Sequence, residues 1–156
     1  MRLNVICVGK TRERFIQEGI AKYERYLRPY ADIEIKVLKE EKIGDLRDAP
    51  LVRKKEAEKI LKAVSADALI IALDERGQEF TSHEFAAFLN RALESGTRDM
   101  VFILGGAMGM DESVTKRANT IMALSRWTLT HEMARLVLLE QLYRAFTIIR
   151  GKTYHY

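Results

Sequence analysis

Three glycines follow one strongly apolar run of the chain, in the segment ILGGAMGM (103–110). Glycines directly after a strand let a ligand approach the backbone closely, at the sheet edge where open α/β folds bind their ligands. The spacing of Gly105, Gly106 and Gly109 is not G-x-G-x-x-G, and no lysine follows it as in a phosphate-binding loop. The pattern alone therefore fits a ligand-binding loop and a plain tight turn equally well.

A second apolar run ends in LDERG (73–77), where two carboxylates are adjacent. Asp74 and Glu75 could act as a base or bind a metal ion, but adjacent side chains at a strand end point to opposite faces. No histidine cluster accompanies them, so we expect no metal site. We expect both side chains to be solvated charges of a loop.

A third segment, LSRWTLTHEMAR (124–135), compresses a strand end, a turn and a helix start into a few residues. Thr128 and Thr130 are candidate N-caps, and the free amides of such a turn can bind polar ligand atoms. His131 and Arg135 are four residues apart, so they share one face of the helix. A single histidine in a first turn is usually structural, but this pair would stand at the entrance of a cleft.

The chain ends in RGKTYHY (150–156), which mixes cations with aromatic side chains. Tyr154, His155 and Tyr156 offer stacking surfaces and hydrogen-bonding groups, which suit the recognition of an unstacked RNA base. The alternative is a tail that packs its tyrosines on a partner subunit. The residues alone leave both interpretations open.

The elements that would position these segments follow from hydrophobic periodicity and from glycine and proline breaks. Strands alternate with helices, which is typical of an α/β fold with a mainly parallel sheet flanked by helices. No linker divides the chain, so we expect a single domain over residues 1–156. We predict strands at 3–9, 31–38, 68–73, 99–106 and 120–125, helices at 12–28, 51–64, 82–95, 110–119 and 128–149, and a mobile loop at 39–50.

The last predicted helix, 128–149, is apolar on nearly all sides. A helix of this kind must be covered on more than one side. Its own sheet can cover one side, and we expect a second subunit to cover another, which predicts a homodimer. A central helix within a monomer is the alternative, although helices in this fold class flank the sheet.

The composition is that of an ordinary globular protein, with 26 Lys and Arg against 22 Asp and Glu and a net charge of +4. This modest positive charge permits an anionic partner such as RNA without requiring one. The single cysteine, Cys7, lies in an apolar run and is expected to be a buried, inert thiol. The apolar run at the N-terminus is too short for a signal peptide or a membrane span, so we expect a cytoplasmic protein without a membrane partner.

LDERG, FILGGAMG, LSRWTLTHEMARLVLLEQLYRAFTI and a terminal G-x-x-Y-H occur in this order, and the opening VICVGKTRERF belongs to the same pattern. With these motifs the whole chain resembles the SPOUT class of methyltransferases, specifically the small enzymes that methylate N3 of a pseudouridine in bacterial large-subunit (23S) ribosomal RNA. The resemblance implies a SPOUT-type α/β knot, in which the C-terminal part threads through a loop to form the cofactor cleft. Knots are so rare that fold rules alone would have excluded one.

The resemblance also implies a cofactor, S-adenosyl-L-methionine, held mainly by backbone groups of three loops. Carried across by motif, its contacts fall on Leu73, on Gly105, and on the run Leu124, Ser125, Arg126, Trp127, Thr128 and Leu129. The implied substrate is a pseudouridine in a ribosomal RNA stem-loop, presented within an assembled ribosomal particle. The family acts as a homodimer, in agreement with the argument from the last helix.

For the RNA side of the site, we expect Arg135 and Arg144 to bind phosphate or orient the base, and Tyr154 and His155 to hold the target base. The candidate catalytic residues are His155, Arg135 and Tyr154, and His155 is the first candidate for the base that removes the N3 proton. Two other classes of function remain open. A non-catalytic, dimeric ribosome-binding factor would share the charge and the tail, and a nucleotide-dependent α/β enzyme is less favoured because G-x-G-x-x-G is absent.

Overall fold

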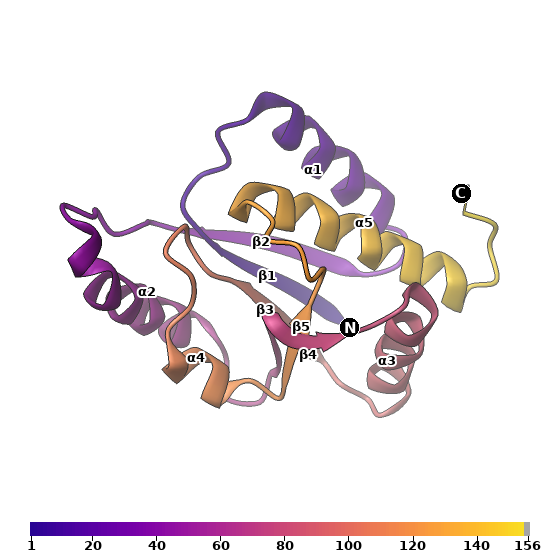
Figure 1. Ribbon diagram of the computed structural model, residues 1–156. Helices are drawn as coiled ribbons and strands as arrows, with labels where there is room; N and C mark the ends of the chain where they lie inside the picture. The colour runs from indigo at the N-terminus through magenta and orange to yellow at the C-terminus, as the bar shows by residue number, and fades with distance from the viewer. Residues whose placement is uncertain (155–156) are drawn as a thin grey trace.

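One five-stranded, fully parallel sheet forms the centre of the protein, in a computed structural model that describes residues 1–154. The strand order is β2-β1-β4-β3-β5 (Figure 1). The strands are β1 (Arg2–Val8), β2 (Asp32–Leu38), β3 (Leu69–Glu79), β4 (Asp99–Leu104) and β5 (Thr120–Ala123). The predicted α/β class with a parallel sheet is confirmed.

Helices cover both faces of this sheet. On one face, α1 (Arg14–Leu27), α3 (Ser82–Glu94) and α5 (His131–Ile149) share a core with Leu3, Val5 and Cys7 of β1. On the other face, α2 (Ala49–Ala63) and α4 (Glu112–Arg117) pack on Ile6 and Val8. Side chains of a strand alternate between its faces, so each run of apolar residues in the central strands contributes to both cores.

Cys7 lies in the first of these cores and is fully buried, as predicted. Burial raises the pKa of its thiol to about 11, because the thiolate would lose its hydration. At neutral pH the group is therefore a protonated thiol without nucleophilic character.

Capping side chains set several helix starts. Thr130 accepts a hydrogen bond from Met133 N–H, so α5 begins at His131 and not at residue 128. Thr81 caps α3 in a reciprocal capping box with Glu84. The predicted loop 39–50 contains a short 3-10 helix (η1, Leu46–Asp48) and the first turn of α2, where Pro50 is tolerated.

Strand β3 is longer than predicted, because it continues through LDERG to Glu79. Its pairing with β5 shifts register between Leu73 and Gln78 and then resumes, with Gln78 opposite Met122. Gly77 permits this approach, since a Cβ atom there would lie 2.7 Å from the backbone of Ile121. The expectation that 73–77 is a loop is therefore wrong.

Helix α5 lies between α1 and α3 and packs on the sheet (Figure 1). Gly19 brings α1 especially near, because a Cβ atom there would lie 2.7 Å from Leu136 Cδ1. Every residue of α5 is buried or half-buried within the single chain. Its two neighbouring helices thus account for much of its apolar circumference. Among residues 1–154, no helix has both the length and the apolarity needed to cross a bilayer.

Candidate functional site

A cleft of about 1140 Å³ opens at the carboxyl edge of the sheet. Its walls come from three strand ends, namely residues 73–76 of β3, the 104–111 segment after β4, and the 124–129 segment between β5 and α5. Parallel strands present their carboxyl ends at one edge, so segments far apart in the sequence meet there. The volume is slightly above the roughly 300–1,000 Å³ typical of sites for drug-sized ligands, so the cleft is large enough for a cofactor.

Most of the residues expected to bind a cofactor line this cleft. They are Leu73, Gly105, Leu124, Ser125, Trp127, Thr128 and Leu129. Arg126 is not among the lining residues, because its guanidinium is exposed and its Nε donates to Glu79 Oε2 at 2.7 Å. The structure thus brings together the glycine loop and the two other motif segments, but directs one side chain of the set away from the cleft.

The glycine loop after β4 is both a tight turn and an open wall. Gly109 N–H donates to the Gly106 carbonyl at 3.0 Å, and Gly109 has a φ of 85° that favours glycine. A Cβ atom on Gly105 would lie 3.0 Å from the Gly109 carbonyl oxygen. The loop therefore leaves bare main chain facing the cleft, where a ligand can reach backbone donors and acceptors.

Polar contacts of β3 hold the opposite wall in place. Glu75 accepts a hydrogen bond from the Thr128 hydroxyl at 3.0 Å, and Glu79 accepts one from Arg126. Both bonds join the extended β3 to the 124–129 segment. Trp127 lies in the sequence between Arg126 and Thr128, which these bonds hold. It lines the cleft and is 84% exposed.

Asp74 departs from its prediction as a solvated loop charge. Its side chain is only 12% exposed and it accepts two hydrogen bonds from the Arg76 guanidinium, each of 2.9 Å. This pairing holds the pKa of the Asp74 carboxyl below its usual range, so the group is ionised at neutral pH. The lining thus carries four carboxylates, of Asp74, Glu75, Asp111 and Glu112, against the two guanidiniums of Arg53 and Arg76.

His131 and Arg135 do not act on the cleft together. His131 lines the cleft, whereas Arg135 is only 2% exposed and is absent from its lining. The Arg135 guanidinium donates to the Val8 carbonyl at 2.6 Å and to the Thr11 hydroxyl at 2.9 Å. Its burial does not fit the expected contact with RNA or substrate, because the side chain faces the N-terminal segment inside the protein.

Arg144 and Tyr154 lie together, but far from the cleft. The Arg144 guanidinium stacks 4.3 Å from the centre of the Tyr154 ring and is also paired with Glu140. Burial raises the pKa of Tyr154 well above its usual value, so the ring packs as a neutral phenol. At about 1.5 Å per residue, Arg144 lies roughly 20 Å along α5 from His131 at the cleft. Tyr154 is the last residue that the structure describes, so the roles expected of His155 lie outside the described residues.

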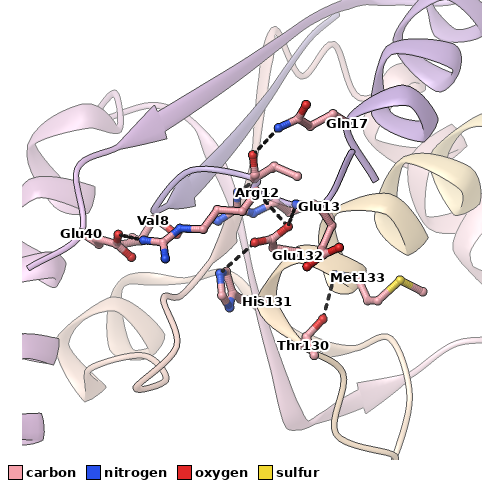
Figure 2. Close-up of polar contacts among 11 residues, drawn as sticks. Val8, Arg12, Glu13, Gln17, Glu40, Thr130, His131, Glu132 and Met133 are labelled. Carbon is pink, nitrogen blue, oxygen red and sulfur yellow. Dashed lines mark hydrogen bonds and ion pairs between the residues drawn. The ribbon is translucent and has the colours of Figure 1, made fainter. Parts of the chain in front are cut away.

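Some residues of the site carried no signal in the sequence. Arg53 of α2 lines the cleft and donates to the Met108 carbonyl at 3.3 Å, although it is one cation among many on its helix. Glu132 joins the first turn of α5 to the N-terminal segment, as Figure 2 shows. Asp111 could have been found, since an acidic residue just before a short helix is a common N-cap.

Across residues 1–154, no cluster of three or more potential metal ligands occurs.

Comparison with known proteins gives a consistent result along the chain. A family model described as "Predicted SPOUT methyltransferase" matches residues 1–155. The chain is 45% identical to a ribosomal RNA large subunit methyltransferase H of Syntrophotalea carbinolica, covering 99% of both chains. It is 42% identical to the protein of that name from Trichlorobacter lovleyi and 43% identical to that from Kosmotoga olearia, and both alignments cover each chain completely.

Proposed function

The chain belongs to the SPOUT methyltransferase family, and we propose that it transfers a methyl group from S-adenosylmethionine to the RNA of the large ribosomal subunit. The observation that carries this proposal is the convergence of the three motif segments on one cleft. The acceptor is N3 of a pseudouridine, as the resemblance of the motifs implies. The names of the similar proteins support a ribosomal RNA substrate.

The residues of the cleft fit the proposed cofactor. Bare main chain around Gly105 suits a ligand held by backbone groups, and the excess of carboxylates over guanidiniums in the lining suits the positive charges of a sulfonium and an amino group. Leu73, Gly105 and the 124–129 segment would hold the cofactor. When bound, S-adenosylmethionine supplies an electrophilic methyl group on its sulfur.

The protein contributes mainly alignment to this reaction. Methyl transfer to nitrogen is an in-line displacement, and its rate depends on how the two reacting atoms are oriented. The bonds of Thr128 to Glu75 and of Arg126 to Glu79 keep the 124–129 wall fixed against β3. His155 is the proposed acceptor of the N3 proton, with Tyr154 holding the base beside it.

A second copy of the chain is part of this proposal. Within one chain, Arg144 and Tyr154 lie roughly 20 Å along α5 from the cleft, too far to hold a base at its mouth. We propose that the protein is a homodimer in which the tail of one protomer completes the cleft of its partner. Deletion of residues 152–156 should then abolish methyl transfer and leave cofactor affinity nearly unchanged, whereas an equal loss of both would make the tail a structural element.

Calorimetric titration and methyl-transfer assays test the function directly. We expect S-adenosylmethionine to bind and NAD or FMN not to bind, because the glycine loop lacks the dinucleotide spacing. Large subunits isolated from a strain without this methyltransferase should accept a labelled methyl group from the purified protein. The protein would instead be a non-catalytic ribosome-binding factor if it bound these particles but showed no heat of S-adenosylmethionine binding and no methyl transfer.

A further inference from the structure

The turn between β1 and α1, residues 9–13, adjoins the cofactor cleft. Cys7 of β1 lies beside Leu104 of β4 in the parallel sheet, so the chain after β1 runs next to the glycine loop after β4. A Cβ atom on Gly106 would lie 3.2 Å from a methyl group of Val8. Gly9 then turns the chain with a φ of 80°. Lys10 and Arg12 are therefore placed at a margin of the cleft, on the side away from β5.

Two buried charged side chains of α5, Glu132 and Arg135, form hydrogen bonds with this turn. The Glu132 side chain is only 10% exposed, and its carboxylate accepts hydrogen bonds from Arg12 N–H at 2.9 Å and from Glu13 N–H at 3.0 Å. Arg135 donates to Val8 and Thr11, on the other side of the same turn. Figure 2 shows the Glu132 carboxylate between His131 and the backbone of Arg12 and Glu13. These two charged side chains of α5 thus direct their hydrogen bonds to residues 8–13.

Such an arrangement is costly for folding alone. Burying an ionised side chain costs several kcal/mol before its hydrogen bonds offset the loss of hydration. Here the acceptors and donors are mostly backbone groups of a surface turn, which water could have satisfied. Glu132 and Arg135 fix the backbone of this turn. The turn thereby places the exposed cations Lys10 and Arg12. Within residues 10–14 the three cations Lys10, Arg12 and Arg14 and the one acid Glu13 are all exposed, and Arg12 and Arg14 each pair with one exposed glutamate outside the turn.

We propose that this basic turn binds the phosphate backbone of the RNA substrate, with Lys10 and Arg12 as the contacts and Glu132 and Arg135 as positioning residues. The inference depends on the proposed function, because it assigns the RNA that the cleft methylates to this margin. Charge supports the assignment, because carboxylates outnumber guanidiniums in the cleft lining by four to two, whereas Lys10 and Arg12 are exposed beside it. Arg12 also pairs with Glu40 at 2.9 Å, an exposed contact that phosphate can replace at little cost.

Glu132 also connects the turn with the cleft itself. Its Oε1 lies 3.9 Å from Nε2 of His131, whose ring lines the cleft, while its Oε2 accepts the two N–H bonds of the turn. Glu132 thus fixes the backbone of the turn and lies next to a residue that lines the cleft.

Substitution of the cations tests the proposal. For Lys10→Ala and Arg12→Ala we expect the KM for large subunits to rise roughly 3- to 10-fold, with kcat and the Kd for S-adenosylmethionine unchanged. The slope of log K against log salt should become less steep by about 0.7 to 0.9 for each lost phosphate contact. The matched control is Lys62→Ala, an exposed lysine at the far end of α2, at the opposite edge of the sheet.

The positioning role is tested by Glu132→Gln, which keeps the shape and one acceptor but removes the charge. We expect it to raise the KM for large subunits and to flatten the salt dependence as the lysine variant does. A role in stability alone would lower the melting temperature without changing that slope. Should Glu132→Gln fail to fold, the lysine and arginine variants still decide the matter.

Two results would overturn the inference or its premise, and they are distinguishable. If Lys10→Ala and Arg12→Ala match Lys62→Ala in KM and in salt dependence, the turn does not bind RNA. If the unaltered protein transfers no methyl group to large subunits, the proposed function fails, and the salt dependence of particle binding still reports on the turn.

Discussion

Single residues at the cleft make the most direct predictions, and Trp127 offers one without any mutation. It is the only tryptophan in the chain and is 84% exposed while lining the cleft. Binding of S-adenosylmethionine beside it should shift its emission to shorter wavelength and protect it from acrylamide quenching, because water is displaced from the indole. Free methionine at the same concentration serves as the control. An unchanged spectrum at saturating cofactor would show that the wall formed by 124–129 is not in contact with the ligand.

Gly105 gives a second prediction at this scale. A methyl group there would lie 3.0 Å from the Gly109 carbonyl oxygen, which is backbone and cannot move aside cheaply. Gly105→Ala should therefore distort the loop and weaken S-adenosylmethionine binding at least tenfold, about 1.4 kcal/mol or more. Gly44→Ala is the matched control, because its nearest neighbour would be Asp48 Oδ2 at an ordinary 3.7 Å. Titration calorimetry measures both, and equal affinities would refute the role of the bare backbone.

The sequence predicted residues of this kind unevenly. Leu73, Gly105 and most of 124–129 were placed by motif, and they do line the cleft. Arg135 was placed by its spacing from His131, but spacing on one helix face cannot tell which side chain turns inward toward β1. Glu132 was missed entirely, since its partners Arg12 and Glu13 are almost the whole chain away. Contacts at such separation leave no local pattern.

At the scale of elements, the joint between α1 and α5 predicts a pH dependence. The hydrogen bonds from Glu13 and Arg12 lower the pKa of Glu132 from its ordinary value of 4.5. A lowered pKa in the folded state means that Glu132 contributes stability above its unfolded pKa and loses that contribution as pH falls through the folded value. The free energy of unfolding should therefore decline below about pH 4.5.

Urea denaturation between pH 3 and pH 7 measures this decline. Glu132→Gln should unfold more easily at pH 7 and show a shallower loss of stability toward low pH, because one of the titrating groups is gone. Glu18→Gln is the control, since Glu18 forms an exposed pair with Arg14. The explanation fails if the two variants and the unaltered protein show the same pH profile.

The presence of each helix and strand was largely predictable from the sequence, but the residues at which they begin and end were not. Apolar periodicity located each of the described strands and α-helices, though not the short 3-10 helix η1, because burial on a sheet or helix face imposes a period of 2 or 3.6. The extension of β3 through LDERG was missed, since charged residues ending an apolar run suggest a loop. What keeps 73–79 extended is its second pairing with β5, and that pairing depends on Gly77 and on a strand that lies far along the chain.

For the whole molecule, the separation of tail and cleft predicts complementation between two defective chains. A protomer with Gly105→Ala keeps an intact tail, and one lacking residues 152–156 keeps an intact cleft. If the tail acts across a homodimer, mixing equal amounts of the two after brief denaturation should restore methyl transfer to about a quarter of the normal rate, since about half of the dimers are mixed and each of these holds one complete site of two. Mixtures in which activity stays at the level of the separate variants would place the tail in its own chain.

The hydrogen bonds between α5 and the turn 9–13 have a consequence for synthesis. They join residues separated by 119 and 120 positions, the latter being Arg12 and Glu132. Residues 8–13 leave the translating ribosome first, and the groups that fix them are made among the last, several seconds later at about 5 to 20 residues per second. A nascent or prematurely terminated chain that lacks α5 therefore carries Lys10 and Arg12 on a turn that no hydrogen bonds from α5 hold. The proposed surface for binding ribosomal RNA forms only after α5 has been synthesised.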